Sequence, residues 1–294
     1  MPARGANEAH LLDAFETTAR PLMPDDVSAL HELSVSVGWP HRARDLATLI
    51  EIGEGFLACD EIGRAAGSAM CFPMGEGFAT IGMMVTTPRL QHHGAGRWLL
   101  RKVMERCAGR ELRLNATQQA YRLYQSEGFI PVRTIRLCEG IARNLAVPPA
   151  PSGTVLRAAG RQDIDIISAL DLAAFGADRG AIFRSVFPEC EGLILERAGT
   201  PVGFALVREF GRGWLIGPVV APDETAARAL IAPLVIGHAG RFVRIDIGQE
   251  YSALRSFLHD AGLAETDKVT SMVFGPNRAG RTPGVFALMS HTLG

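Results

Sequence analysis

Residues 83–100 read MMVTTPRLQHHGAGRWLL. The apolar run that ends at Pro88 is typical of a buried strand, and the apolar periodicity that begins at Ala95 is typical of a helix. The loop between them contains Gly94 and Gly96, and it leaves backbone N–H groups unpaired at the helix N-terminus. Such an end carries partial positive charge and attracts a pyrophosphate. Glycine suits this loop because a side chain would hold a ligand away from the backbone, and because some loop positions require positive φ.

The loop admits three other interpretations: an ordinary turn or helix start, a dinucleotide site and a metal site. A G-x-G sequence alone also occurs in ordinary turns and helix starts. The dinucleotide fingerprint G-x-G-x-x-G needs a third glycine, and Leu99 stands at that place, so a nicotinamide cofactor is disfavoured. The two adjacent histidines diverge and have no third ligand nearby in sequence, so no metal site is predicted.

The sequence Q-H-H-G-A-G at residues 91–96, directly after a strand that ends in proline, resembles the acetyl-coenzyme A signature Q/R-x-x-G-x-G/A of the GNAT family of N-acetyltransferases. The resemblance covers the first half of the chain in the order of its elements. It implies that acetyl-coenzyme A binds here, with its pantetheine arm paired to the backbone of Met84, Val85 and Thr86 as an added strand. The loop residues implied to hold the pyrophosphate or flank it are Gln91, His92, His93, Gly94, Ala95, Gly96 and Arg97. For the Arg97 side chain, a solvated charge stays an alternative.

A second informative stretch is LNATQQAYRLYQSEGF, residues 114–129, which resembles the pattern A-x-x-L-Y-x-x-x-G-F of the same family. The resemblance implies that Tyr124 lies near the thioester sulfur and acts as general acid. A phenol can supply a proton to the leaving thiolate without being charged beforehand. The alternative is that Tyr124 packs at the helix edge with its hydroxyl in water. Asn115 is expected either to hydrogen-bond the cofactor or to cap the following helix.

The general base and the acceptor site are less defined. Some relatives carry a glutamate on the strand before the phosphate loop, but residues 79–84 contain no carboxylate, so a water relay or Glu51 stays open as the base. The acceptor wall in this fold is usually built from the first two helices, which makes Trp39 and His41 candidates. Trp39 as a core plug that closes a loop is the alternative.

The segment 144–153, NLAVPPAPSG, has the composition of an interdomain linker and divides the chain into domains 1–143 and 154–294. In the first half we expect a strand, two helices, a three-stranded antiparallel meander, the glycine loop with its helix, a strand, a helix and a final pair of strands after Gly128. The second half repeats this order. The predicted fold is α/β with a mixed sheet, as two tandem GNAT-like acyl-CoA N-acyltransferase folds.

The second half is predicted to be a degenerate GNAT-like domain. Where the first half has its phosphate loop, the second has no glycine, and Asp223 and Glu224 would repel a pyrophosphate. Leu258 stands where Tyr124 is expected. This half is expected to complete the acceptor cleft or to make an oligomer contact. The stretch that contains Asp178 and Arg179 resembles one in the C-terminal domain of tandem family members. The alternative is that Asp178 is an ordinary helix cap and Arg179 a surface charge.

The composition limits the partners. The 294 residues include 30 Lys and Arg against 31 Asp and Glu, which gives no overall reason to bind nucleic acid or an anionic membrane. The sequence has no apolar run long enough to predict a signal peptide or a membrane span. The five cysteines form no C-x-x-C pair, so we expect neither a disulfide framework nor a zinc site, and we expect a cytoplasmic protein. A homodimer stays open.

The predicted function is direct transfer of acetyl from acetyl-coenzyme A to a primary amine of a small molecule, in a ternary complex that needs no covalent enzyme intermediate. A non-catalytic acyl-CoA-binding sensor and an acetyltransferase acting on a protein lysine or N-terminus are the alternatives.

Overall fold

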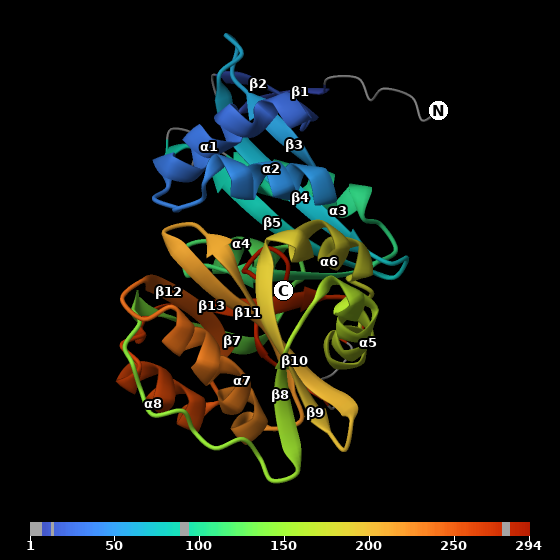
Figure 1. The fold of residues 1–294 in the computed structure, drawn as a ribbon. Helices are drawn as coiled ribbons and strands as arrows, with labels where there is room; N and C mark the ends of the chain where they lie inside the picture. Colours follow the sequence, from blue (N-terminus) through green and yellow to red (C-terminus); the bar gives the residue numbers. More distant parts are fainter. Residues whose placement is uncertain (1–7, 13–14, 89–93, 278–282) are drawn as a thin grey trace. The chain divides into compact units, whose positions relative to one another are not determined.

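The computed structural model describes residues 8–12, 15–88, 94–277 and 283–294 (Figure 1). The chain folds as two compact units, Met1–Leu112 and Arg113–Gly294. The division falls inside one strand, ahead of the proline-rich segment. The two units are defined by the contacts within each of them and not by the end of a sequence repeat. The domain boundaries at 143 and 154 therefore stay a prediction. No helix in the described ranges is long and apolar enough to cross a membrane.

The first unit is an antiparallel sheet with helices, and its strands are ordered β1-β2-β3-β4-β5. Its elements are β1 (Glu8–Leu12), β2 (Phe15–Pro21), the 3-10 turn η1 (Pro24–Asp26), α1 (Val27–Ser36), α2 (Ala43–Ile52), β3 (Glu54–Cys59), β4 (Ala65–Met74), β5 (Phe78–Thr86) and α3 (Ala95–Arg106). The three-stranded meander is confirmed. Strand β1 is an addition that the sequence pattern did not predict.

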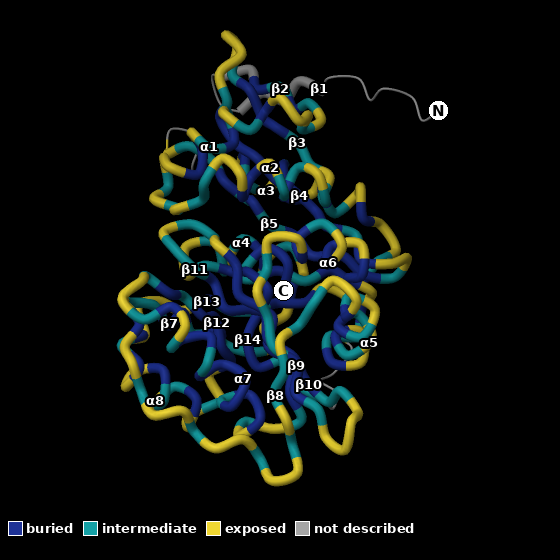
Figure 2. The backbone as a smooth tube through the Cα atoms, in the orientation of Figure 1, coloured by how far each residue is buried: buried dark blue, intermediate teal, exposed yellow. Residues whose placement is uncertain are grey.

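Strand β4 forms the centre of the first unit. It is buried along almost its whole length, as Figure 2 shows, and α1 and α3 both pack against it. A strand covered on both faces is read in sequence as a continuous apolar run rather than an alternating one. The core therefore fixes the end of β5 relative to the start of α3, the two elements that the phosphate loop joins.

The second unit is a larger mixed sheet with the order β6-β13-β7-β12-β14-β11-β10-β9-β8. Its elements are β6 (Glu111–Ala116, which begins at the unit boundary), α4 (Tyr121–Ser126), β7 (Ile130–Ile141), β8 (Thr154–Ala158), η3 (Arg161–Asp163), α5 (Ile164–Phe175), α6 (Gly180–Val186), η4 (Phe187–Glu189), β9 (Cys190–Arg197), β10 (Thr200–Phe210), β11 (Gly213–Ala221), α7 (Glu224–Gly237), β12 (Phe242–Gly248), α8 (Ser252–Asp260), β13 (Ala264–Phe274) and β14 (Gly284–Ala287). Its core gathers where α7 packs on β9, β10 and β11.

Strand β7 differs from expectation. The pair of strands predicted after Gly128 is wrong, because a single strand of 12 residues occupies this segment. Both of its neighbours come from the second half of the chain: β13 pairs with it through Val273 and Ile130, and β12 through Phe242 and Ile141 (Figure 1). Strand β13 thus lies between β6 and β7. The second half supplies the strand that completes this part of the sheet.

A repeated ion pair marks the duplication of the plan. Arg20 donates two hydrogen bonds to Asp26, at 2.7 and 2.6 Å, and Arg157 donates two to Asp163, at 2.9 and 2.8 Å. In both pairs the carboxylate also accepts the backbone N–H three residues upstream, at 2.8 Å. The guanidinium hydrogen bonds hold the pKa of each aspartate below its ordinary value. The same device joins strand to 3-10 turn at the start of each half.

Arg179 is buried, so the alternative that it is a surface charge is wrong. It is 1% exposed, donates to Asp171 at 2.9 and 2.6 Å, and lies 3.9 Å from the centre of the Phe175 ring. An arginine can be buried where a carboxylate and an aromatic face satisfy it. Its neighbour Asp178 accepts the N–H of Gly180, the first residue of α6, at 2.8 Å, while Arg179 itself holds the cap position.

Candidate active site

The end of β5 carries a β-bulge. Two of its residues, Met83 and Met84, stand opposite the single residue Ala69 of β4. Met83 takes a left-handed backbone, with φ of 49°, and the Ser68 hydroxyl donates to its carbonyl oxygen at 2.7 Å. A bulge takes one residue out of the ladder and bends the strand, so backbone groups become available for other partners. This is the backbone stretch that the GNAT resemblance assigns to the pantetheine arm.

Ser68 and Met83 were not among the residues predicted from sequence. One signal was present: Ser68 is a lone hydroxyl in a strand that is otherwise apolar and buried, and a buried hydroxyl requires a partner. The identity of that partner could not be predicted, because a positive φ at methionine has no signature in the sequence.

The first turn of α3 follows the bulged strand. Gly94 precedes the helix with φ of 85° and ψ of −7°, and its carbonyl oxygen accepts the N–H of Trp98 at 3.0 Å. Ala95 is buried against Ala66 of β4, whereas Gly94 and Arg97 are exposed. The expectation of a positive φ in this loop is met at Gly94. The first-turn N–H groups of such a helix have no acceptor within the helix and are suited to an anion.

Three residues predicted for the same loop, Gln91, His92 and His93, lie outside the described residues. Their role at the pyrophosphate stays a prediction.

Tyr124 lies on α4 in the second unit and is 6% exposed. Its ring meets that of Phe129 edge-on, with centres 6.0 Å apart, and its carbonyl oxygen accepts the Phe129 N–H at 3.1 Å. Burial raises the pKa of the phenol well above its ordinary value. The phenol is therefore protonated at physiological pH, and it is withdrawn from solvent rather than lying in water at a helix edge.

Asn115 is tied to residues from the second half of the chain. Its amide nitrogen donates to the carbonyl oxygen of His291 at 2.8 Å, and its amide oxygen accepts from the Ser271 hydroxyl on β13. The capping alternative is wrong, because α4 begins only at Tyr121 and Ala120 holds the cap position. A contact with the cofactor stays a prediction.

A polar cluster adjoins Asn115. Arg244 donates to Asp246 through two hydrogen bonds of 2.8 Å, and its Nη2 lies 3.1 Å from Nε2 of His291. Burial lowers the pKa of His291 to about 4, so its ring is neutral at physiological pH. The same Nε2 lies 3.4 Å from an oxygen of the Asp246 carboxylate, so the ring faces both members of the ion pair. Sequence reasoning missed this cluster because its members are far apart along the chain.

Trp39 and His41 lie in the segment that joins α1 and α2 of the first unit. Trp39 packs against a core cluster that includes Leu33 and Val85, and its ring meets that of His41 edge-on at 5.8 Å. Nδ1 of His41 lies 2.8 Å from the Ser34 hydroxyl, which donates to the Trp39 carbonyl oxygen at 3.3 Å. These contacts agree with a plug that closes the loop. An acceptor-wall role stays a prediction.

The equivalent positions of the second half are occupied by its own side chains. Asp223 accepts the N–H of Ala226 at 2.8 Å and caps α7, and Glu224 accepts the N–H of Leu254 at 2.6 Å. Two carboxylates thus stand where a pyrophosphate would need room and positive potential. Leu258 is fully buried in the core.

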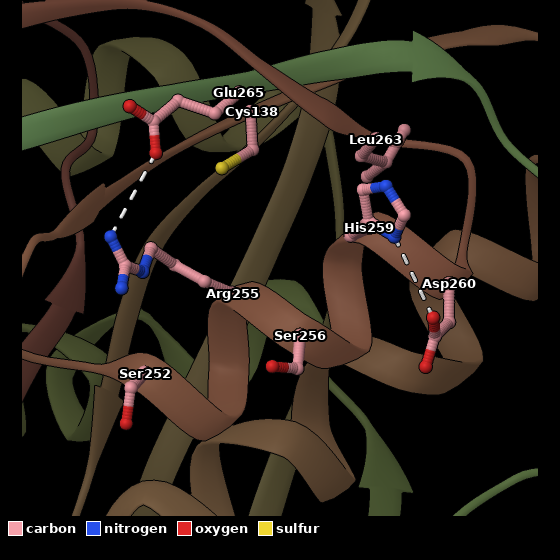
Figure 3. A pocket seen from close by; sticks show the side chains of 8 residues that line it. All are labelled: Cys138, Ser252, Arg255, Ser256, His259, Asp260, Leu263 and Glu265. Carbon is pink, nitrogen blue, oxygen red and sulfur yellow. Dashed lines mark ion pairs between the residues drawn. The ribbon is translucent and has the colours of Figure 1, made fainter.

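The second unit also contains a cavity of about 410 Å³ beside α8 (Figure 3). It is lined by Cys138, Ser252, Arg255, Ser256, His259, Asp260, Leu263 and Glu265. Its polar side chains lie in pairs, with Arg255 at 3.8 Å from Glu265 and His259 at 3.7 Å from Asp260. Burial raises the pKa of the Cys138 thiol to about 12, which leaves that group unreactive. Within the described part of the chain, this lining includes none of the predicted site residues.

Comparison with known families matches each half of the chain separately. Residues 25–129 match the model described as "Acetyltransferase (GNAT) family", and residues 167–287 match the model described as "Acetyltransferase (GNAT) domain". The first match contains the bulge, Gly94 and Tyr124.

Known proteins with similar sequence or structure extend over nearly the whole chain. An uncharacterized N-acetyltransferase, YitH of Bacillus subtilis strain 168, is 26% identical over 277 residues, 93% of this chain and 97% of that protein. A putative acetyltransferase from Pyrococcus horikoshii has a TM-score of 0.78 at 19% identity, covering 99% of this chain and 100% of the other. A tandem GNAT protein from the clavulanic acid biosynthesis pathway has a TM-score of 0.64 at 17% identity, covering 89% and 100%. At these identities the solved structures show the fold alone.

Proposed function

Because this chain belongs to the GNAT family of acetyltransferases, with two GNAT-type domains in tandem, we propose that it transfers an acetyl group from acetyl-coenzyme A to a primary amine of a small molecule. The observation that carries the proposal is the bulge at Met83 and Met84, followed by a left-handed glycine at the start of α3. The bulge supplies backbone hydrogen-bonding groups and the helix start supplies amides for phosphate.

Acetyl-coenzyme A supplies an activated acyl group as a thioester. Backbone groups of Met84, Val85 and Thr86 bind and orient its pantetheine arm as an additional strand would be bound. The amides from Gly94 to Arg97 hold the pyrophosphate, together with the loop residues that precede them.

Tyr124 acts as the general acid. Its hydroxyl proton passes to the sulfur as the carbon–sulfur bond breaks and the carbon–nitrogen bond to the amine forms, so free thiol leaves together with the amide product. A buried phenol with a raised pKa is in the protonated form that this step needs. The amine attacks directly while both substrates are bound, and the proton that it loses passes to a water relay or a carboxylate.

The acceptor is proposed to be a small amine rather than a nucleic acid or a membrane surface. The near balance of 30 basic and 31 acidic residues supports this choice, and the reducing cytoplasm is the proposed compartment, where five free cysteines are stable.

The proposal is tested by following thiol release from acetyl-coenzyme A with a panel of primary amines. We expect amine-dependent release, and a fall in kcat of roughly 100-fold in Tyr124→Phe with the Kd for acetyl-coenzyme A unchanged. Tyr121→Phe is the matched control, three residues away on the same helix, and is expected to keep full turnover. Binding without thiol release on any amine would favour a sensor. Full turnover in Tyr124→Phe would remove this residue from the mechanism.

A further inference from the structure

The helix that carries the proposed acid is short. Helix α4 has six residues, Tyr121–Ser126, and a helix of this length does not hold its own shape in water. The orientation of the Tyr124 phenol therefore depends on what packs against it. Catalysis by a positioned acid is sensitive to displacements of about 1 Å, so this packing matters for the reaction.

Three aromatic rings form a continuous chain in the second unit. The rings of Tyr124 and Phe129 are 6.0 Å apart at 64°, and those of Phe129 and Phe274 are 5.6 Å apart at 44°. Edge-on and tilted pairs at these separations attract one another beyond the area that they bury. Phe129 is 1% exposed, whereas Phe274 is 39% exposed. Phe274 thus lies at the exposed end of this row of three rings, and Phe129 packs between it and Tyr124.

Phe274 comes from the second half of the sequence, at the end of β13. The register pairs Val273 with Ile130, so Phe274 continues this pairing beside Phe129. Gly128 has φ of 93°, and a Cβ added there would lie 3.2 Å from Cε2 of Phe274. The glycine that ends α4 therefore meets two needs: a left-handed turn, and room for an aromatic ring from the other half of the chain.

We propose that Phe274 is a positioning residue, which orients the Tyr124 phenol through the ring of Phe129. The inference rests on the proposed function, because it needs Tyr124 to be the acid. In the second half of the chain, Asp223, Glu224 and Leu258 replace the phosphate loop and the acid. This half nevertheless contributes to the reaction proposed for the first half, because its strand β13 supports the acid.

The test compares Phe274→Ala with Phe274→Tyr, which keeps the ring. Val132→Ala is the matched control, because Val132 has the same exposed fraction, 39%, on the neighbouring strand β7. The chain has three tyrosines, so ¹³C labelling of tyrosine rings gives three signals, with a fourth in Phe274→Tyr, and Tyr124→Phe identifies the one from Tyr124. Each variant is measured for kcat with the amine found active, for the Kd of acetyl-coenzyme A by calorimetry, and for the pH titration of the Tyr124 signal.

We expect Phe274→Ala to lower kcat by roughly tenfold while the Kd for acetyl-coenzyme A stays within about twofold. The Tyr124 signal should shift, and its titration should move toward the ordinary tyrosine range because the ring becomes hydrated. Phe274→Tyr and Val132→Ala should leave all three measurements near wild type. If Phe274→Ala does not fold, Phe274→Leu takes its place with the same expected results.

An unchanged Tyr124 signal and titration in the ring-free variant would overturn the inference, and so would an equal loss of kcat in Val132→Ala. The proposed function fails differently. Full turnover in Tyr124→Phe would refute the acid, while the tyrosine signal, which needs no substrate, would still show whether Phe274 orients that ring.

Discussion

At the scale of single residues, Gly94 and Gly63 take nearly the same left-handed backbone in the first unit, with φ of 85° and 80°. Gly94 begins α3, and Gly63 lies in the turn between β3 and β4, where an added Cβ would meet nothing within 4 Å. Alanine variants at these two positions can therefore be compared. Both introduce backbone strain, and only the variant at Gly94 also disturbs the phosphate loop.

We expect Gly94→Ala and Gly63→Ala each to lower the free energy of unfolding by about 1–2 kcal/mol, the cost of a left-handed alanine. Only Gly94→Ala should weaken acetyl-coenzyme A binding, by roughly tenfold or about 1.4 kcal/mol. Thermal denaturation and titration calorimetry measure the two effects. Equal coenzyme affinity in both variants would argue against α3 as the phosphate site.

Tyr124 gives a prediction in pH. Because burial raises the pKa of its phenol, the protonated donor persists as the pH rises through the ordinary tyrosine value of about 10. We therefore expect kcat to show no alkaline decline from Tyr124 between about pH 9 and 11, the range in which a phenol of ordinary pKa loses its proton. The check is the pH profile of kcat in wild type and in Tyr124→Phe. A decline in that range that vanishes in the variant would show an unshifted phenol.

The helix that carries Tyr124 and the positive φ at Gly94 could be predicted from sequence because their surroundings are local: a short loop, one helix, one following glycine. Arg179 could not, because the partner that allows its burial, Asp171, lies one helix earlier and nothing in the spacing marks it as buried. His291 could not either, since Arg244 and Asp246 lie more than 40 positions away, on β12.

At the scale of elements, the bulge in β5 accepts a hydrogen bond from one hydroxyl, that of Ser68. The Ser68–Met83 hydrogen bond is buried and holds the carbonyl of a residue with unfavourable φ. Ser36 offers a comparison, because its hydroxyl donates to the Leu33 carbonyl at 2.7 Å in α1, away from the bulge.

Ser68→Ala leaves the Met83 carbonyl without this donor, and we expect a loss of about 1–3 kcal/mol in the free energy of unfolding. The affinity for acetyl-coenzyme A should fall as the bulge relaxes. Ser36→Ala should reduce stability less and leave the affinity unchanged. Denaturant unfolding and calorimetry measure both. Wild-type affinity in Ser68→Ala would show that the bulge does not need its serine.

Element order could be predicted because periodicity and turn residues are local, and the GNAT-type mixed fold is confirmed. The bulge could not, since it depends on register between two strands. The repeated pair of Arg20 with Asp26 and Arg157 with Asp163 did leave a trace, an arginine followed six positions later by aspartate at the start of each half. This spacing indicates a repeat only when the structure shows that both carboxylates bind their arginine and the backbone N–H three residues upstream in the same way.

At the scale of the whole molecule, the two halves share one sheet in the second unit. Strand β6 and strand β7 of the first half are separated by β13 of the second. Sequence could not predict this exchange, because a strand carries no mark of whether its partner is the next segment or one more than 100 residues later.

The exchange predicts how truncated chains behave. Residues 1–143 alone would leave β6 and β7 without the strand between them and with exposed edges, so we expect this fragment to aggregate or to unfold without cooperativity. Co-expression with residues 144–294 should restore a folded complex. Circular dichroism during thermal unfolding is the measurement. A fragment 1–143 that unfolds cooperatively and binds acetyl-coenzyme A by itself would contradict the structural role given to β13.

The central claim is that one half of this duplicated chain holds the coenzyme and the other does not. Titration calorimetry of the full chain with acetyl-coenzyme A tests it most directly. The account predicts one molecule bound per chain, with affinity that falls in Gly94→Ala and is unchanged when Asp223 is replaced by asparagine. No heat of binding, or two molecules per chain, would contradict it.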